Sequence, residues 1–237
     1  MAMGKEEQDR LKLEAAQRAL ALVEPGMTVG LGSGSTATMW IKLLGEKVQR
    51  GELKLKGAIA SSEDSERLGR SYGIPFTSFK ETKELDLTVD GADEVLLDSK
   101  DAGLALIKGG GGKLLREKIV ASASKRFVVV VDESKVVEKL GRFPLPVEVI
   151  PMAEPLVRRE LEGMGFVLKV RVNKDGSEYI TDEGNLILDC SGVMIDDPVG
   201  MGAKLDSIVG VVEHGLFLGM AEMVLIAGEG GVRERRR

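Results

Sequence analysis

Short apolar segments alternate with amphipathic ones from residue 6 to residue 131, and this alternation constrains the fold more than any other feature of the chain. Apolar residues recur every three or four positions in the first amphipathic segment, which predicts a helix over 6–23. We further predict helices at 35–48, 63–72 and 114–122, and buried strands at 27–31, 55–61, 85–89, 104–107 and 127–131. Strands that alternate with helices run parallel, so we expect a parallel sheet with helices on both faces.

The pattern changes after the closely spaced prolines Pro144, Pro146 and Pro151. Here strands outnumber helices, with helices predicted at 153–164 and 201–208 and strands at 166–172, 178–181, 186–190, 209–213 and 219–227. All but the last of these fit a split β-α-β unit, and the last returns to the first sheet. The predicted fold class is therefore α/β: a Rossmann-like, mostly parallel sheet flanked by helices, with a smaller α+β (ferredoxin-like) domain. We expect residues 1–144 and 213–237 to form an α/β catalytic domain, and residues 145–212 the small domain.

Charge and composition exclude several classes of function. Lysine and arginine number 33 against 38 acidic residues, so the net charge of −5 argues against a nucleic-acid partner. Cys190 is the single cysteine and His214 the single histidine, which excludes an internal disulfide and zinc sites with several Cys or His ligands. The chain has neither an apolar run of the ~20 residues that span a bilayer nor a signal-peptide pattern. We therefore expect a soluble, cytoplasmic protein that binds no membrane.

Glycines cluster where predicted strands end, and the first cluster is the segment Gly30–Ala37. A glycine turn between a strand and a helix lets backbone N–H groups approach an anion, and the hydroxyls of Ser33, Ser35 and Thr36 add donors around Gly34. This pattern suits a phosphate. It also matches a dinucleotide-binding fingerprint, and a third interpretation is a packing turn followed by a helix cap.

Two acidic residues follow another buried strand, in the segment Asp90-Gly91-Ala92-Asp93. Ligands bind at the carboxyl edge of open α/β sheets, where carboxylates hold sugar hydroxyls or move protons. The alternative interpretation is an Asp-Gly turn with a helix cap.

Four glycines in a row follow Lys108, at Gly109, Gly110, Gly111 and Gly112. Such a run is costly in backbone entropy, which suggests backbone amides that close on a ligand. Lys108 can face developing negative charge.

Glu117 lies early in the following helix and could serve as a base. Its alternative is a surface ion pair with Lys113, Arg116 or Lys118. Lys135, after the strand 127–131, is either a ligand-binding residue or a solvated lysine.

Taken together, these segments resemble the type A ribose-5-phosphate isomerase family. GLGSGSTA, VDGADE, KGGGGKLLREKI, VVVVDESK and FPLPVEVIPM occur in this order, and GNLILD and GLF follow. The similarity runs from residue 6 to residue 228, and five motifs in order are far more specific than any one of them.

The resemblance implies roles for individual residues. Glu117 matches the catalytic base, and Asp90 and Lys108 match the other catalytic residues. The matching substrate-binding residues are Ser33, Gly34, Ser35, Thr36, Asp90, Gly91, Ala92, Asp93, Lys108, Gly109, Gly110, Gly111 and Lys135. Lys12 falls where the family has a phosphate-contacting lysine. The chain departs from the family at Gly112-Lys113, where small apolar residues are usual.

The reaction implied is the interconversion of D-ribose 5-phosphate and D-ribulose 5-phosphate through a cis-enediolate. Asp90 would assist ring opening, Glu117 would move the proton between C2 and C1, and Lys108 with the glycine amides would stabilise the enediolate oxygen. No cofactor or metal is expected, and the family suggests a homodimer or homotetramer. Three alternatives stay open: a sugar-phosphate sensor, a nicotinamide oxidoreductase and a coenzyme A transferase.

Overall fold

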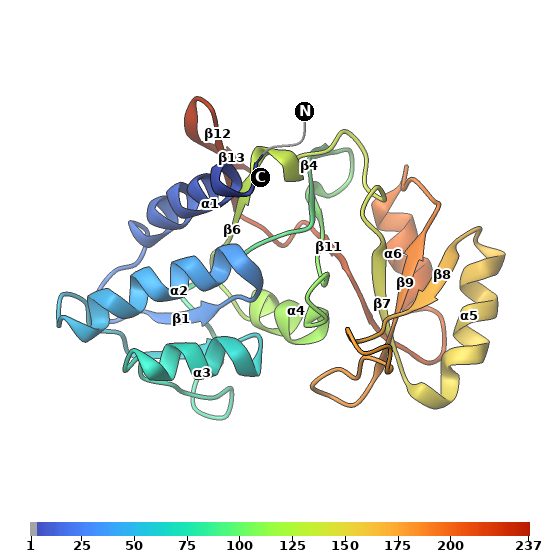
Figure 1. Ribbon diagram of the computed structural model, residues 1–237, viewed down its shortest axis with the longest axis horizontal. Coiled ribbons are helices and arrows are strands. Elements are labelled where there is room, and N and C mark those ends of the chain that lie inside the picture. Colours follow the sequence, from blue (N-terminus) through green and yellow to red (C-terminus); the bar gives the residue numbers. More distant parts are fainter. Residues whose placement is uncertain (1–3) are drawn as a thin grey trace. The chain divides into compact units, whose positions relative to one another are not determined.

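The computed structural model describes residues 4–237 and divides into two compact units (Figure 1). The first unit contains residues up to Ala92, then Arg116–Val136 and Met220–Arg237, and the second contains Asp93–Leu115 and Val137–Gly219. These units differ from the expected domains mainly in that Asp93–Leu115 joins the second unit. The division into domains 1–144 with 213–237 and 145–212 stays a prediction.

The first unit is built on a six-stranded sheet with the order β13-β12-β6-β3-β1-β2. Every neighbouring pair is parallel except β12 and the edge strand β13. The strands are β1 Thr28–Leu31, β2 Gly57–Ala60, β3 Leu87–Asp90, β6 Phe127–Asp132, β12 Met223–Gly228 and β13 Gly231–Arg236. The helices are α1 Lys5–Leu20, α2 Gly34–Gln49, α3 Glu63–Ser71 and α4 Leu114–Ser122, and the short 3₁₀ turn η1 is Glu133–Lys135.

The core of this unit forms because its central strands are apolar along their whole length. β6 is buried throughout, as strands of a sheet covered on both faces are. From α1, Leu11, Ala15 and Ala19 pack into the same core, so the three-and-four-residue spacing read from the sequence is the buried face of the helix.

The strand order reverses between β1 and β3, and this reversal positions the site. From β1 the chain continues to β2 on one side, whereas from β3 it continues to β6 on the other. In open α/β sheets, ligands bind outside the carboxyl ends of the strands at such a switch point. The segments that begin at Gly32 and at Asp90 both leave the sheet there.

The second unit contains the ferredoxin-like arrangement that the sequence predicts. The chain runs β7-α5-β8-β9-α6-β10, and the strands form an antiparallel sheet with the order β10-β7-β9-β8. These elements are β7 Leu145–Val149, α5 Glu154–Gly163, β8 Val167–Val170, β9 Leu186–Ser191, α6 Pro198–Asp206 and β10 Val211–His214, with the 3₁₀ turn η2 at Pro151–Ala153. The unit also holds a three-stranded antiparallel sheet of β4 Glu94–Ser99, β5 Gly103–Ile107 and β11 Leu216–Leu218.

The predicted fold class is confirmed, but two predicted strands are wrong, and four observed strands were not predicted: β4, β7, β11 and β13. The strand expected at 104–107 does not join the parallel sheet: as β5 it pairs with β4 and β11. The expected strand 178–181 is irregular, with one bridge between Val172 and Glu178. β7 was not predicted because Pro146 interrupts it, although it is a central strand. In residues 4–237, no helix combines the length and apolar character needed to cross a membrane.

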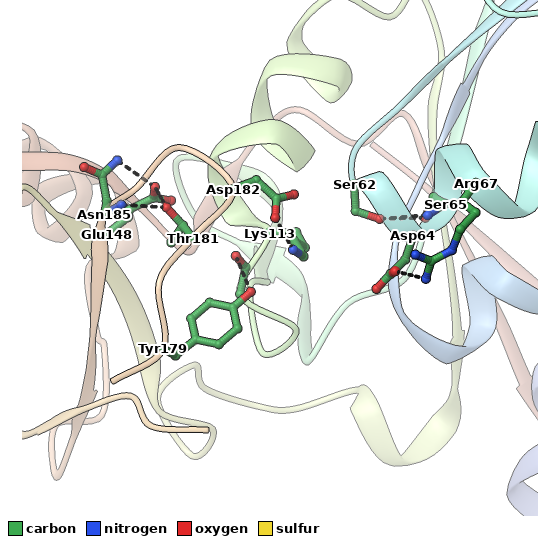
Figure 2. A network of polar contacts seen from close by, with 11 residues as sticks. Ser62, Asp64, Ser65, Arg67, Lys113, Glu148, Tyr179, Thr181, Asp182 and Asn185 are labelled. Atoms are coloured by element: carbon green, nitrogen blue, oxygen red, sulfur yellow. Dashed lines mark hydrogen bonds and ion pairs between the residues drawn. The ribbon is translucent and has the colours of Figure 1, made fainter. Parts of the chain in front are cut away.

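A buried carboxylate lies in the ferredoxin-like sheet. Glu148, on β7, accepts hydrogen bonds from Thr181 Oγ1 at 2.8 Å and Asn185 Nδ2 at 2.9 Å, as Figure 2 shows. Burial raises the pKa of Glu148 above its ordinary value, although the two hydrogen bonds lower it, and the charges of Glu183 and Glu213 raise it further. Folding therefore shifts this carboxyl group towards its protonated form relative to a solvated glutamate.

Replacing Gly30 with alanine is expected to destabilise the first unit. A Cβ there would lie 1.9 Å from Thr88 Oγ1 and 2.7 Å from Val120 Cγ1, so the core would have to shift. Overpacking of this kind costs about 1–3 kcal/mol. Urea unfolding followed by circular dichroism measures the loss, with Gly230→Ala as the control because a Cβ there meets open space. An unchanged midpoint for Gly30→Ala would show that the strand relaxes freely.

Replacing Glu148 with glutamine is expected to raise the free energy of unfolding at pH 7. A raised folded-state pKa contributes stability below the unfolded-state pKa and loses it as pH rises through the folded-state pKa. Glutamine keeps the accepting oxygen without the charge, so its advantage over the wild type should shrink towards pH 4. Urea unfolding at both pH values tests this, with the exposed Glu160→Gln as control. A variant that is less stable than the wild type at pH 7 contradicts the expectation.

Candidate functional site

The segment between β1 and α2 is pinned to its neighbours at Gly32. A Cβ on Gly32 would lie 2.4 Å from Asp90 Cγ and 2.5 Å from the carbonyl oxygen of Val89, so only glycine fits against β3. The Gly32 N–H donates to that same carbonyl at 3.0 Å. The Gly32 carbonyl accepts from Ser65 Oγ at 2.7 Å, and Ser65 is placed because Ser62 caps α3 beside it (Figure 2).

Asp90 lies at the carboxyl end of β3 and is 1% exposed. Its Oδ1 accepts hydrogen bonds from the backbone N–H of Ser33 at 2.9 Å and from its neighbour Gly91 at 2.8 Å. Two fixed donors on one oxygen set the direction of the carboxylate. A hydrogen bond between Ser33 and Asp90 therefore joins the two segments predicted separately, Gly30–Ala37 and Asp90–Asp93.

Ser33 makes a second contact through its side chain. Its hydroxyl donates to Oε1 of Glu117, which lies in the first turn of α4 and is 5% exposed. Burial of this carboxylate does not fit the alternative in which Glu117 is a solvated surface residue. One serine thus holds two carboxylates that are 27 positions apart in the chain, Asp90 through its N–H and Glu117 through its hydroxyl.

The other residues of the first unit that were predicted to bind the substrate differ in their exposure to solvent. Thr36 is buried in the first turn of α2, whereas Gly34 and Ser35 are exposed at the N-terminus of that helix. Gly34 has a φ of +83°, which only glycine adopts at low cost. Gly91 and Ala92 are half-buried, and anions are favoured at the start of a 16-residue helix such as α2.

Lys135 ends the short turn η1 after β6 and is half-buried. The buried Asp132 shapes this turn, because its Oδ1 accepts from the N–H of Ser134 at 3.0 Å and from the hydroxyl of the same residue. The sequence analysis did not assign a role to Asp132. The signal was present, since an aspartate two residues before a serine is typical of an Asx turn. On α1, Lys12 lies 3.8 Å from Asp9 and is largely buried.

The second unit carries the lysine and the glycine loop. Lys108, at the end of β5, is 2% exposed, and its N–H donates to the Gly215 carbonyl at 2.9 Å. Its Nζ lies 5.5 Å from the centre of the Phe217 ring. Asp93 belongs to this unit rather than to that of Asp90, and its Oδ2 accepts from the Gly110 N–H at 2.8 Å. The two aspartates of the segment Asp90–Asp93 therefore act in different units: Asp90 binds the Ser33 N–H, and Asp93 binds the Gly110 N–H.

The glycine loop, Gly109–Gly112, closes as a turn in which the Gly112 N–H donates to the Gly109 carbonyl at 2.9 Å. Gly109 and Gly112 have φ values of +100° and +76°. A Cβ on Gly112 would lie 2.5 Å from the ring of Tyr179. Glycine is thus required at Gly109 and Gly112 by backbone conformation, and at Gly112 also by the close approach of Tyr179.

Lys113, where the chain departs from the family pattern, forms an ion pair inside the second unit. Its Nζ lies 2.5 Å from Oδ1 of Asp182, as Figure 2 shows. Partial burial lowers the pKa of Lys113, but the hydrogen bond and the negative charge of Asp182, together with the nearby Tyr179 hydroxyl, raise it by more, so the pKa is raised overall. The lysine is therefore charged at neutral pH and ties the end of the loop to the segment before β9.

One three-residue group in residues 4–237 brings possible metal ligands within 4.8 Å of one another: Asp206, Glu213 and His214. His214 Nδ1 accepts from the Leu216 N–H at 3.2 Å, so the proton of the neutral ring lies on Nε2, which faces Asp206 Oδ1 at 3.2 Å. Both ring nitrogens are thereby engaged. The hydrogen bonds of His214 to Leu216 and Asp206 account for the closeness of these three side chains.

Chemically, each unit carries groups suited to a different task. The first contributes two oriented, buried carboxylates and a hydroxyl-rich helix N-terminus, which suit proton transfer and anion binding. The second contributes a buried ammonium group and a loop with exposed backbone amides, which suit stabilisation of an oxyanion. Sequence analysis did not single out Arg171, which donates to the Gly109 and Gly110 carbonyls of that loop, or Asp189, which accepts from Arg171.

Comparison with known proteins identifies relatives of this chain. A family model described as ribose 5-phosphate isomerase A (phosphoriboisomerase A) matches residues 57–231. The ribose-5-phosphate isomerase A of Desulfatibacillum aliphaticivorans is 49% identical over 230 residues, covering 97% of this chain and 98% of the relative. The protein called ribose-5-phosphate isomerase A 1 in Oceanobacillus iheyensis is 48% identical over 220 residues, covering 93% and 95%.

Solved structures agree with these relatives. Ribose 5-phosphate isomerase A from Methanocaldococcus jannaschii superposes with a TM-score of 0.90 and 40% identity, covering 97% of this chain and 100% of the other. A D-ribose-5-phosphate isomerase in complex with phospho-erythronic acid gives a TM-score of 0.92 and 38% identity, covering 99% and 100%. Sequence and fold match over nearly the whole length, and the chain therefore belongs to the ribose-5-phosphate isomerase A family.

Proposed function

We propose that the chain interconverts D-ribose 5-phosphate and D-ribulose 5-phosphate, with Glu117 as the base that moves the proton. The observation that carries this assignment is the buried Glu117 carboxylate held by the Ser33 hydroxyl at the switch point of a parallel sheet. Family membership supplies the reaction, and a related structure contains phospho-erythronic acid, a phosphorylated sugar acid, which supports a sugar phosphate as substrate. The reaction belongs to the non-oxidative interconversion of pentose phosphates.

The hydroxyl-rich start of α2 is suited to the anionic end of the substrate. Ser35 and Gly34 are exposed there, and the helix N-terminus favours negative charge. We assign Ser33, Gly34, Ser35 and Thr36 to substrate binding, together with the half-buried Lys135.

Ring opening precedes isomerisation, because the furanose form has no free carbonyl group. Asp90 is assigned to this step: it takes the proton of the anomeric hydroxyl and returns a proton to the ring oxygen as the bond from C1 to that oxygen breaks. The N–H groups of Ser33 and Gly91 set the orientation of the Asp90 carboxylate. Because both donors belong to the backbone, this orientation does not depend on the rotamer of another side chain. Gly91, Ala92 and Asp93 complete the substrate-binding segment in this proposal.

Glu117 then removes the proton from C2. The electron pair of that C–H bond forms the C1–C2 double bond, and the aldehyde oxygen at C1 becomes negatively charged. Return of the proton to C1, with transfer of the C2 hydroxyl proton to the negatively charged oxygen on C1, gives the ketose. Lys108, Gly109, Gly110 and Gly111 are assigned to substrate binding, with the ammonium group of Lys108 countering the charge that develops on oxygen. Oxidation at C2 balances reduction at C1, so the proposed steps involve no cofactor.

The proposal also covers the compartment, the assembly and the partners of the protein. We propose a cytoplasmic enzyme that acts as a homodimer or homotetramer, as the family resemblance suggests, with no nucleic-acid or membrane partner. The single cysteine supports a reducing compartment, and burial raises the pKa of Cys190 to about 12, so the thiol is unreactive at neutral pH. Light scattering of the purified protein measures the assembly.

Replacing Glu117 with glutamine is expected to lower kcat at least ~100-fold, because a positioned base contributes ~10²–10⁴-fold. Glutamine has the same shape and still accepts the Ser33 hydroxyl, so substrate should still bind. Ketose formation from ribose 5-phosphate, with a chelator present, measures the rate. The control is Glu46→Gln on the exposed face of α2.

The outcomes separate the alternatives. Wild-type protein that binds ribose 5-phosphate without turnover would point to a sensor and contradict the proposed function. Equal rates for the wild type and Glu117→Gln would keep the isomerase but remove Glu117 from its role as base.

A further inference from the structure

Arg171 follows β8 in the second unit, and its side chain is only 13% exposed. Two of its nitrogens face one carboxylate: Nε donates to Asp189 Oδ2 at 3.0 Å, and Nη2 donates to Oδ1 of the same residue. The remaining nitrogen, Nη1, donates to the carbonyl of Gly109 at 2.7 Å and to that of Gly110 at 3.2 Å. One guanidinium group therefore connects β9 to the glycine loop.

These contacts set the direction of the loop amides. In a trans peptide, the C=O and the following N–H point to opposite sides. The peptide that joins Gly109 to Gly110 is held on both sides, since its carbonyl faces Arg171 and its N–H donates to Asp93 Oδ2 at 2.8 Å. The next peptide has its carbonyl on Arg171 too, so the N–H of Gly111 points away from the guanidinium.

The Gly111 N–H is also accessible. Gly111 is exposed, and a Cβ placed on it would meet nothing within 4 Å. Within the part of the chain that the structure describes, this N–H has no hydrogen-bond partner, whereas those of Gly110 and Gly112 are engaged. A donor in this state is ready to bind an anionic oxygen without first breaking an internal bond.

We infer that Arg171, held by Asp189, is a positioning residue that aims the Gly111 N–H at the enediolate oxygen formed in the reaction. This inference rests on the proposed function. Arg171 does not touch the reacting atoms in this scheme and acts through the backbone it orients. The planar guanidinium is required because the three N–H donors of a lysine sit on one nitrogen, which cannot reach both oxygens of a carboxylate and two carbonyls at once.

Replacing Arg171 with lysine is the central test, because it keeps the positive charge. If Arg171 orients an oxyanion donor, kcat for ribose 5-phosphate should fall about 10–100-fold, less than the ~10²–10³-fold lost when such a donor is removed. KM should change less than kcat, since the donor acts mainly after the proton has moved. Asp189→Asn, which loosens the guanidinium, should lower kcat by a smaller factor.

The matched control is Arg158→Lys in the same unit. Arg158 lies on α5, where it pairs with Glu154 and Glu162, away from the glycine loop. It should leave kcat unchanged. A stability measurement on every variant identifies losses that come from unfolding, and added guanidinium ion should partly restore kcat of Arg171→Ala but not that of a merely destabilised protein.

Binding of phospho-erythronic acid, measured by calorimetry, provides a readout without turnover. Its carboxylate is planar and anionic like an enediolate, so Arg171→Lys should weaken its binding by a factor similar to the loss of kcat. Wild-type protein that binds this compound but does not isomerise ribose 5-phosphate contradicts the proposed function alone. Unchanged kcat and unchanged binding in folded Arg171→Lys overturn the inference, as does a rise in KM at constant kcat. Wild-type protein with neither activity nor binding overturns both.

Discussion

The hydrogen bonds of Ser33 are the contacts on which the rest of the candidate site depends. Its N–H holds Asp90 at 2.9 Å and its hydroxyl donates to Glu117, so one residue sets two buried carboxylates. In this geometry residue 32 lies against β3. It must be a glycine, because any Cβ would meet Asp90 and the Val89 carbonyl. A buried carboxylate is costly unless donors compensate it, and the short segment after β1 supplies those donors.

In the second unit, the glycine loop also depends on contacts from other segments, because its four glycines have no side chains. Its shape is imposed from outside, by Asp93 on the Gly110 N–H, Arg171 on two carbonyls and Tyr179 against Gly112. Lys113 anchors the end of the loop on Asp182. A flexible run of glycines becomes a defined turn because neighbouring groups satisfy its polar atoms and limit its space.

Several elements were predictable from the sequence because local patterns determine them. The strand 127–131 and the helix 114–122 are observed as β6 and α4 with nearly the same bounds, since each has the periodicity of its type and clear end signals. β7 was missed because Pro146 reads as a breaker, yet its neighbours on both sides complete the sheet. β5 was placed in the wrong sheet because strand pairing is decided by partners distant in the chain, and no local pattern names them.

The sequence by itself determined the fold class, the family and the residue types of the site, because motif order and apolar periodicity are properties of the chain. Tertiary structure alone decided which groups meet. Ser33 and Glu117 are 84 positions apart, and Arg171 and Gly109 are 62 apart. Their contacts arise only when the sheets form, since each hydrogen bond depends on strand order and register, which no local sequence pattern reveals. Arg171 therefore looked like any surface arginine until its three donor nitrogens were seen on Asp189 and the glycine loop.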